Sequence, residues 1–323
     1  MRTLSKTALT SGAGETLFSE CPSPSKKAPC FYHWTRVRFV VKLNAILRLA
    51  RIEHGLIAAF ATAVGYAVGA GSWFSVEKIQ LAVAAIVTIA VEVGLFIFND
   101  VFNLEEDRVN APERPLVKGE ISVKEAVAVG AISLALGGVL AGALGPLALA
   151  IVLLAISTGM AYNIRMKKSG LPGNVIVALD TALPFLLGAV VASGAKVPIL
   201  AYLFTLIAFL AALGREILKG IVDLDGDRKV GIRTIAATKG EAFAARLSSS
   251  ILLAAITLSI IALAFVKESA LLAYTALVSV TDVLFAYAAA SLLMNSDKIT
   301  AEKGRRITLV AMFAGTLAFA AAA

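Results

Sequence analysis

Apolar runs of about twenty residues recur along most of this chain, separated by short polar segments. A helix of that length can cross the hydrocarbon core of a bilayer, which is roughly 30 Å thick. Backbone polar groups cannot stay unpaired in lipid, so each run is expected to be helical, and the alternation typical of barrel strands is not seen. The sequence therefore predicts an all-α, polytopic membrane protein with about nine spans. They are 52–71, 79–102, 123–144, 146–164, 173–193, 198–221, 241–266, 269–294 and 303–322.

The N-terminal segment does not follow this pattern. Residues 1–32 are polar, rich in Ser, Thr, Pro and Lys, and lack the continuous apolar core of a signal peptide, so they are predicted to be a flexible tail. Residues 33–51 mix aromatic and aliphatic side chains with several arginines, as in a basic helix that lies at the membrane interface. We expect residues 33–322 to form a single transmembrane domain.

Composition narrows the function classes. Of the residues, 59% are hydrophobic and 16% are charged, against about 45–50% and about 25% in soluble domains. Two cysteines and two histidines exclude a disulfide framework and make a zinc or haem site a poor interpretation. The net charge of +8 comes largely from short loops between spans, which favours a membrane surface and anionic substrates over nucleic acid. Nothing indicates an obligatory protein partner.

The basic residues also predict an orientation. Fifteen Lys and Arg residues lie in or directly beside the loops after the second, fourth, sixth and eighth spans, and only Lys78, Lys196 and Lys267 lie on the opposite side. By the positive-inside rule, the charged loops and the N-terminus are expected to be cytoplasmic.

Two segments carry oxygen-bearing side chains where a span meets the charged side. In the first, Asn99, Asn103 and Asp107 are spaced four residues apart, which places them in one stripe on a helix. Carboxylate and amide oxygens suit Mg²⁺, which binds a few such ligands together with substrate phosphates. The stripe therefore predicts a magnesium site at the membrane edge.

The second segment repeats this spacing with Asp223 and Asp227, and continues it inward with Lys219 and Arg215. Lys and Arg can contact phosphate oxygens directly, while the acids reach them through Mg²⁺. The arrangement predicts a second Mg²⁺ and a bound diphosphate. Spans two and six run in the same direction, so both segments lie on the same membrane side.

The loop YNIRMKKSGLPGN, residues 162–174, adds polar side chains on that side. Tyr162, Arg165, Lys167 and Lys168 either help to bind the diphosphate or simply reflect positive-inside topology. Two isolated acids lie inside spans. Asp180 could line the same cavity or be a hydrogen-bonded packing residue, and Asp282 is more typical of packing.

At these residues the chain resembles the UbiA-type intramembrane prenyltransferases. The resemblance spans about residues 43–322 and rests on NDVFNLEED (99–107), NAPERPLVKGEIS (110–122), YNIRMKKSGLPGN and REILKGIVDLDGDRKVG (215–231). It implies nine helices around a lipid-open cavity, and it implies that the two motifs hold Mg²⁺ and a prenyl diphosphate. Arg114 of the second quoted segment is counted among the diphosphate-binding residues. Asn103 and Gly220 stand where similar sequences usually carry Asp.

Within the family, these motifs are most similar to those of archaeal enzymes that move a geranylgeranyl group onto geranylgeranylglyceryl phosphate. The resemblance thus implies Mg²⁺-dependent ionisation of the allylic C–O bond and capture of the carbocation in a cavity that excludes water. An aromatic acceptor, as in quinone synthesis, is the alternative. A cation-coupled transporter is less favoured because its ion sites usually lie near the bilayer midplane. A non-catalytic lipid-binding scaffold is the third alternative.

Overall fold

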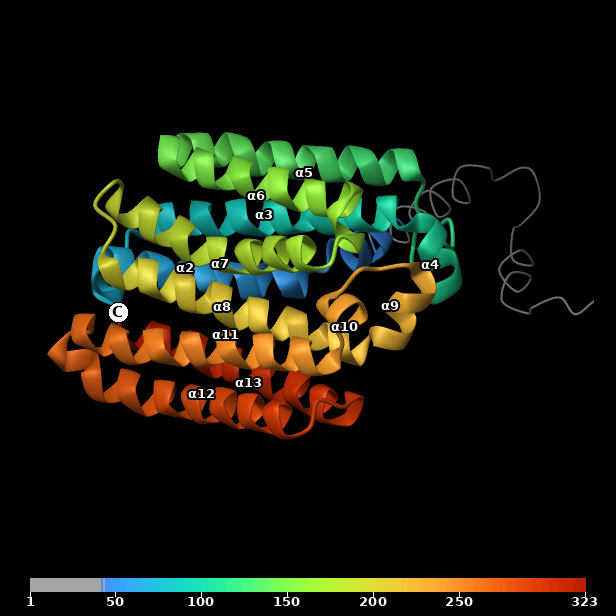
Figure 1. Cartoon of the computed structure of the whole chain (residues 1–323). Coiled ribbons are helices and arrows are strands. Elements are labelled where there is room, and N and C mark those ends of the chain that lie inside the picture. The colour runs from blue at the N-terminus through green and yellow to red at the C-terminus, as the bar shows by residue number, and fades with distance from the viewer. Residues whose placement is uncertain (1–41, 43) are drawn as a thin grey trace, which may run out of the picture.

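The computed structural model describes residues 42 and 44–323 and is helical throughout that part, with no strand in it. Within it, nine helices are long and apolar enough to span a membrane, as predicted (Figure 1). They are α2 (Ile52–Ala70), α3 (Lys78–Phe102), α5 (Val123–Leu144), α6 (Pro146–Ile164), α7 (Leu171–Ser193), α8 (Ile199–Val222), α11 (Glu241–Ala262), α12 (Glu268–Met294) and α13 (Lys298–Ala321).

Short helices occupy the connections. Helices α4 (Leu104–Asn110), α9 (Leu224–Val230) and α10 (Ile235–Lys239) lie together at one end of the bundle. Three 3₁₀ turns, η1 (Trp73–Ser75), η2 (Met166–Lys168) and η3 (Leu263–Phe265), complete the chain. Residues 44–50 are helical and precede α2. The rest of the predicted interfacial helix, apart from residue 42, and the predicted tail lie outside the described residues.

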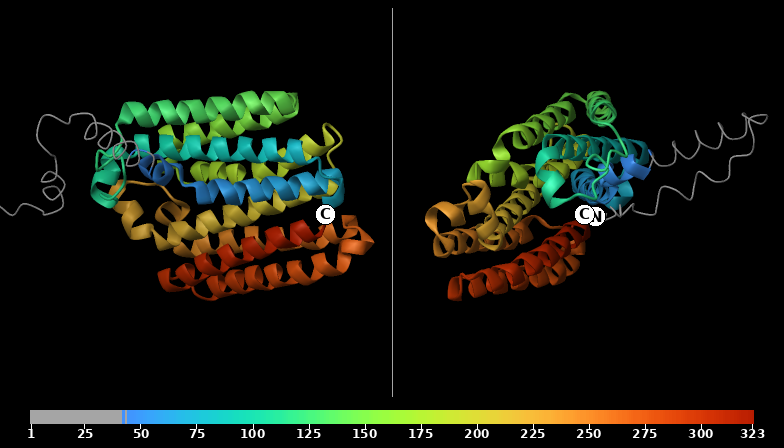
Figure 2. Two further views of the ribbon diagram at one scale, coloured as in Figure 1. Left: turned by 180° about the vertical axis from the view of Figure 1, so that it is seen from behind. Right: turned by 90° about the vertical axis from the view of Figure 1, so that its right-hand side faces the viewer.

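Consecutive long helices pack against one another, and the last returns to the first. Contacts run from α2 through α3, α5, α6, α7, α8, α11 and α12 to α13, and α13 also contacts α2. Helix α7 additionally packs against α2, and α13 against α8. Figure 2 shows α11–α13, orange to red, along one side of the molecule and α5 and α6, green, along the other. The ends of α3, α6 and α8 that carry polar residues therefore face the same way.

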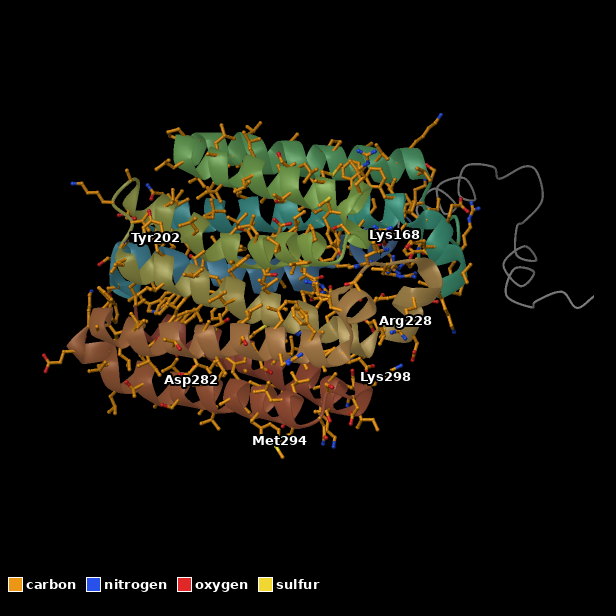
Figure 3. The ribbon with its side chains drawn as sticks, in the orientation of Figure 1. Lys168, Tyr202, Arg228, Asp282, Met294 and Lys298 are labelled. Carbon is orange, nitrogen blue, oxygen red and sulfur yellow. The ribbon has the colours of Figure 1, made fainter. Side chains whose placement is uncertain are left out.

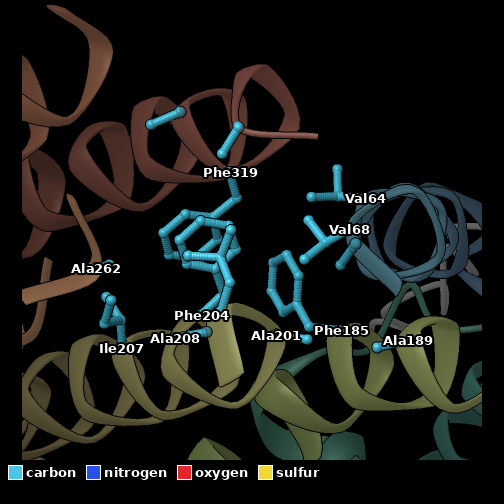
Figure 4. Packing of buried hydrophobic residues seen from close by; sticks show 14 of the residues in the cluster. Val64, Val68, Phe185, Ala189, Ala201, Phe204, Ile207, Ala208, Ala262 and Phe319 are labelled. Atoms are coloured by element: carbon cyan, nitrogen blue, oxygen red, sulfur yellow. The ribbon is translucent and has the colours of Figure 1, made fainter. Parts of the chain in front are cut away.

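Aromatic side chains join the two sides of the bundle. The rings of Phe204 (α8) and Phe319 (α13) stack with centroids 3.9 Å apart and planes 9° apart. Phe185 of α7 meets Phe319 edge to face at 5.7 Å, and Val64 and Val68 of α2 pack beside them (Figure 4). Such aromatic pairs contribute about 0.5–1.5 kcal/mol each beyond the area they bury, so this cluster fixes α2, α7, α8 and α13 together.

The sequence carries two GxxxG segments, at Gly65–Gly69 and Gly138–Gly142, and this spacing predicts close helix packing at both. The structure shows such packing at the first. A Cβ on Gly65 would lie 1.9 Å from the Phe185 carbonyl oxygen, and one on Gly69 would lie 2.7 Å from that of Ala189, so α2 and α7 touch through backbone. The same expectation for Gly138 and Gly142 is wrong. A Cβ on Gly138 would meet nothing within 4 Å, because the neighbouring Gly137 faces α3 instead.

The start of the ninth span differs from the prediction. Helix α13 begins at Lys298, with the Asp297 carboxylate accepting the Thr300 N–H at 2.7 Å as an N-cap, rather than near residue 303. The first turns of the helix are polar because they project beyond the apolar run. Arg305 and Arg306, which were counted with the basic residues beside the preceding loop, lie well inside this helix.

Candidate active site

The first predicted stripe survives a break between two helices. Helix α3 ends at Phe102, Asn103 forms a joint at φ −94° and ψ 8°, and α4 follows. Helical hydrogen bonds continue across this joint: the Asn103 N–H donates to the Asn99 carbonyl at 3.0 Å, and the Asp107 N–H donates to that of Asn103 at 2.8 Å. The three residues consequently occupy successive turns, with Asn103 and Asp107 buried.

The second motif has the same construction. Helix α8 ends at Val222, Asp223 forms a joint at φ −91° and ψ 4°, and the seven-residue α9 follows. The Asp223 N–H donates to the Lys219 carbonyl at 3.0 Å, and the Asp227 N–H to that of Asp223 at 2.9 Å. Asp223 is exposed and Asp227 is half-buried. Two separate spans therefore position their motifs in the same way, with a long helix followed by a joint residue and a short helix.

Each side chain of the first motif has a protein partner. The Asn99 amide donates to Asn163 Oδ1 at 2.9 Å, and Asn163 donates in turn to the Leu95 carbonyl at 3.0 Å. Lys167 Nζ donates to Asn103 Oδ1 at 2.8 Å. Asp107 is ion-paired with Arg114. Asn163 was not among the predicted site residues, although it follows Tyr162 directly in the segment 162–174.

Arg114, which the resemblance counts among the diphosphate-binding residues, contacts the acids of the first motif. Its Nη1 donates to Asp100 Oδ1 at 2.9 Å as well as pairing with Asp107. Asp100 is 3% exposed and also accepts from Arg51 Nη2 at 2.6 Å. Removing one partner of a buried ion pair leaves the other charge uncompensated, so Arg114 orients the motif.

The two lysines of the α6–α7 loop meet Glu106 of α4. Lys167 and Lys168 each place Nζ 2.8 Å from a Glu106 carboxylate oxygen. These hydrogen bonds lower the pKa of Glu106 to about 2. Glu106 thus stays ionised and holds both lysines beside the first motif. Arg165 is exposed at the end of α6, and Tyr162 is half-buried one turn earlier.

The cations of the second motif share one acid, Glu216. Lys219 Nζ lies 3.0 Å from both Glu216 carboxylate oxygens, and Arg215 Nη1 lies 3.5 Å from one of them. Glu216 was not among the predicted site residues, although its position between Arg215 and Lys219 in the sequence could have indicated that it pairs with them. Lys219 and Arg215 are therefore held near the motif before any substrate is bound.

The two acids of the second motif form no ion pair within the described residues, and their charges interact. Burial, followed by the charge of Asp223, raises the pKa of the Asp227 carboxyl. Two carboxylates with unfavourable mutual repulsion are a fitting site for a divalent cation. Beside them, Gly220 leaves room for Thr234, whose Cβ would lie 3.3 Å from a Cβ on that glycine. An Asp at position 220 would crowd Thr234.

The α6–α7 loop connects the two motifs. Its lysines contact Asn103 and Glu106, and its Lys168 carbonyl accepts the Arg233 N–H at 3.4 Å. Gly170 has φ +73°, and a Cβ there would lie 1.9 Å from the Arg233 carbonyl oxygen, so only glycine allows this contact. Figure 3 shows Lys168, Arg228 and Lys298 at the end opposite Tyr202. All the predicted site residues therefore gather at one end.

A cavity of about 40 Å³ lies deeper in the bundle, between α3, α6 and α7. Its wall is largely aliphatic but includes Glu92 and Asp180. Asp180 accepts from Thr158 Oγ1 at 2.7 Å, so it both lines a cavity and is hydrogen-bonded. Asp282 accepts from Ser259 Oγ at 2.7 Å between α11 and α12, away from both motifs, as a packing residue does.

The donor set agrees with Mg²⁺ chemistry. In the part of the chain that the structure describes, no three His, Cys, Asp or Glu side chains form a ready-made cage for an ion. Mg²⁺ usually binds through one or two carboxylates plus substrate phosphates and water, which is what Asp107 and the Asp223–Asp227 pair offer.

Membrane-length helices that bring two acidic motifs and a basic loop together at one end define a membrane-embedded prenyltransferase. A model of the UbiA prenyltransferase family matches residues 58–317, and the chain belongs to this family. It is 36% identical over 283 residues to digeranylgeranylglyceryl phosphate synthase of Archaeoglobus fulgidus, covering 87% of this chain and 96% of that protein. The Ignicoccus hospitalis synthase is 34% identical, with 85% and 90% covered.

Solved structures agree with this fold. One described as digeranylgeranylglyceryl phosphate synthase is 30% identical, with a TM-score of 0.77, covering 86% of this chain and 97% of its own. A UbiA homologue from Archaeoglobus fulgidus bound to GPP and Mg²⁺ is 20% identical, with a TM-score of 0.62 and coverage of 85% and 99%.

Proposed function

We propose that this enzyme transfers a geranylgeranyl group from geranylgeranyl diphosphate to geranylgeranylglyceryl phosphate, releasing diphosphate. The observation that carries the proposal is the convergence of two like-built acidic motifs on one basic loop. This geometry suits a diphosphate, and the names of the relatives at 34–36% identity supply the acceptor. The product would be an ether lipid with two prenyl chains.

The metal site follows from the donor chemistry. Asn99, Asn103 and Asp107 would hold one Mg²⁺, and Asp223 with Asp227 a second. When bound, Mg²⁺ supplies Lewis-acid neutralisation of the leaving diphosphate. The repulsion between Asp223 and Asp227 supports this assignment, since a cation between them would relieve it.

The basic side chains would bind the diphosphate oxygens. Lys219, Lys167 and Lys168 are each within 3.0 Å of a carboxylate, so they are already oriented at the site. Charge-assisted hydrogen bonds to an anion could replace or extend these contacts. Tyr162 and Arg165 lie at the end of α6 beside this loop and complete the proposed diphosphate-binding group. Arg114 contributes indirectly, by orienting Asp107.

The apolar helices would hold the prenyl chain and exclude water. The cavity between α3, α6 and α7 has a largely aliphatic lining but, at about 40 Å³, is much too small for a geranylgeranyl chain, so the chain would lie along the apolar helices that border it. Water would otherwise hydrolyse an allylic carbocation, so a dry path for the chain protects the reaction. By the positive-inside rule, the charged loops support a mouth of the site on the cytoplasmic side.

The experiment is an acceptor comparison with purified full-length protein and geranylgeranyl diphosphate, with and without Mg²⁺. We expect Mg²⁺-dependent diphosphate release with geranylgeranylglyceryl phosphate and little with 4-hydroxybenzoate. Preference for 4-hydroxybenzoate would favour the aromatic alternative. Absence of diphosphate release with every acceptor would overturn transfer chemistry and favour a transporter or scaffold.

A further inference from the structure

We infer that Arg305 of α13, together with Arg215 of α8, forms a second anion subsite that binds the phosphate of the acceptor. This inference rests on the proposed function and deepens it. It also assigns Arg215, which the sequence placed on the diphosphate, to the acceptor side.

The chemistry of the proposed reaction requires two anion sites at once. The donor loses its diphosphate, whereas the acceptor keeps its phosphate, because the product is still a glyceryl phosphate. The attacking hydroxyl and the phosphate share one three-carbon glycerol unit. The acceptor phosphate must therefore lie next to the diphosphate, on groups that the diphosphate does not occupy.

Close packing of α13 on α8 brings a new cation to this place. A Cβ on Gly304 would lie 3.0 Å from Leu218 Cδ1, so the two helices approach closely immediately beside Arg305. Leu218 and Ala301 share one buried hydrophobic cluster. Arg305 lies along the inward stripe that includes Ala301 and Gly304 and is half-buried. Its side chain is 38% exposed, so the guanidinium lies at the edge of the α8–α13 contact, where a ligand can reach it.

The charges around Arg305 indicate an anion site. Arg305 is close enough to both Arg215 and Asp223 for their charges to interact. Its Nε and Nη2 lie 2.8 and 2.9 Å from the Glu302 carboxylate oxygens, so the guanidinium is oriented from its own helix. Two cations from different helices thus face one region with a single glutamate each.

Arg215 has unused hydrogen-bonding capacity. Its Nε is buried and has no hydrogen-bond partner within the described residues, and its only ion pair there, to Glu216, is a long contact at 3.5 Å. Buried polar groups usually have partners, so this donor calls for a ligand. Paired guanidinium groups match the oxygens of a phosphate.

The position of the pair separates it from the diphosphate site. Lys167 and Lys168 serve the first motif, and Lys219 lies one turn before Asp223 in the second. Arg215 is a further turn deeper, and Arg305 comes from a helix that carries neither motif. The pair therefore flanks the diphosphate site from the α13 side, where a second substrate would approach.

The test uses purified full-length enzyme and compares two acceptors, geranylgeranylglyceryl phosphate and the corresponding geranylgeranylglycerol without phosphate. The variants are Arg305→Ala and Arg305→Lys. Arg306→Ala is the matched control, because Arg306 is the next residue, binds the same Glu302 and is 78% exposed. Thermal unfolding in detergent verifies that each variant is folded.

We expect Arg305→Ala to raise the KM for the phosphorylated acceptor about 10- to 100-fold, the effect of losing a charge-assisted contact. The KM for geranylgeranyl diphosphate and the rate with the phosphate-free acceptor should stay within twofold. Arg305→Lys should fall between wild type and Arg305→Ala, and Arg306→Ala should match wild type.

Two results would overturn the inference. One is an equal loss with both acceptors, which indicates a structural role. The other is a raised KM for the diphosphate donor, which places Arg305 on the donor. Failure of the proposed function gives a different pattern, since wild-type enzyme would then not use the glycerol-phosphate acceptor at all.

Discussion

Most acids of the site are neutralised by a protein cation, and one pair is not. Asp107 binds Arg114, Glu106 binds Lys167 and Lys168, and Glu216 binds Lys219. Asp223 and Asp227 form no ion pair within the described residues, and burial together with the charge of Asp223 outweighs the attraction of Lys219 and raises the pKa of Asp227. A divalent cation is therefore expected to gain more electrostatic stabilisation at the second motif than at the other acids of the site.

Substitution of Asp227 tests this difference. We expect Asp227→Ala to lower the rate of diphosphate release on the order of 10²–10³-fold, as loss of a key electrostatic group does. Asp225→Ala is the matched control, because Asp225 lies in the same short helix but is 75% exposed and contacts only Lys298, at 3.4 Å. Near-normal turnover of Asp227→Ala would remove this motif from the active site.

The raised pKa of Asp227 predicts a pH dependence of metal activation. The shift means that Asp227 holds its proton to higher pH than an ordinary aspartate. Protons then compete with the cation as the pH falls, so the Mg²⁺ concentration for half-maximal rate should rise on acidification. Diphosphate release, titrated with Mg²⁺ between about pH 5 and pH 8, measures this. Asp227→Asn should flatten the dependence, and a pH-independent Mg²⁺ requirement in wild type would contradict the prediction.

At the scale of elements, the site contains the same arrangement of a long helix, a joint residue and a short helix twice. A long helix continues through a single joint residue, Asn103 or Asp223, into a seven-residue helix. The i to i+4 hydrogen bonds persist across each joint, so the helical stripe read from the sequence survives. The α6–α7 loop links the two arrangements. Its Lys167 contacts Asn103 of the first, and its Lys168 and Gly170 contact Arg233, which follows the second.

Gly170→Ala tests this connection. The new Cβ would clash with the Arg233 carbonyl at 1.9 Å, in addition to the cost of a positive φ, so the loop must move. Gly119→Ala is the control, because Gly119 has nearly the same φ, +70°, with nothing within 4 Å. We expect Gly119→Ala to cost about 1–2 kcal/mol of stability and to keep activity, and Gly170→Ala to lose more of both. Thermal unfolding and diphosphate release measure these. Equal effects would show that the backbone contact is unimportant.

At the scale of the whole molecule, the bundle places all of its chemistry at one end. Lys168, Arg228 and Lys298 lie there, and the α7–α8 connection with Tyr202 nearby lies at the other. The aromatic cluster of Phe185, Phe204 and Phe319 is nearer the opposite end and joins the two sides of the bundle. The proposed active site, at this end, would open toward a single aqueous compartment.

Cysteine labelling tests the predicted cytoplasmic orientation. In a background with Cys21→Ser and Cys30→Ser, Arg228→Cys and Lys196→Cys place one thiol at each end of the bundle. A membrane-impermeant maleimide should label Arg228→Cys only in inside-out vesicles and Lys196→Cys only in right-side-out vesicles. The reverse pattern would put the site on the external side.

The sequence by itself determined the spans, the shared direction of the second and sixth spans, and the acidic motifs. Long apolar runs and fixed residue spacings are local features of the chain, so they can be recognised without the tertiary structure. Local pattern also misled at two points, where it predicted a close helix contact at Gly138 and started the ninth helix near residue 303 rather than at Lys298.

The tertiary structure decided which polar side chains meet. Asp100 pairs with Arg51, and Asn99 with Asn163, although these residues are far apart in the chain. Spacing along a helix says which face a side chain occupies, but its partner depends on how helices pack, and packing rests on contacts such as Gly65 on Phe185 that no single segment contains.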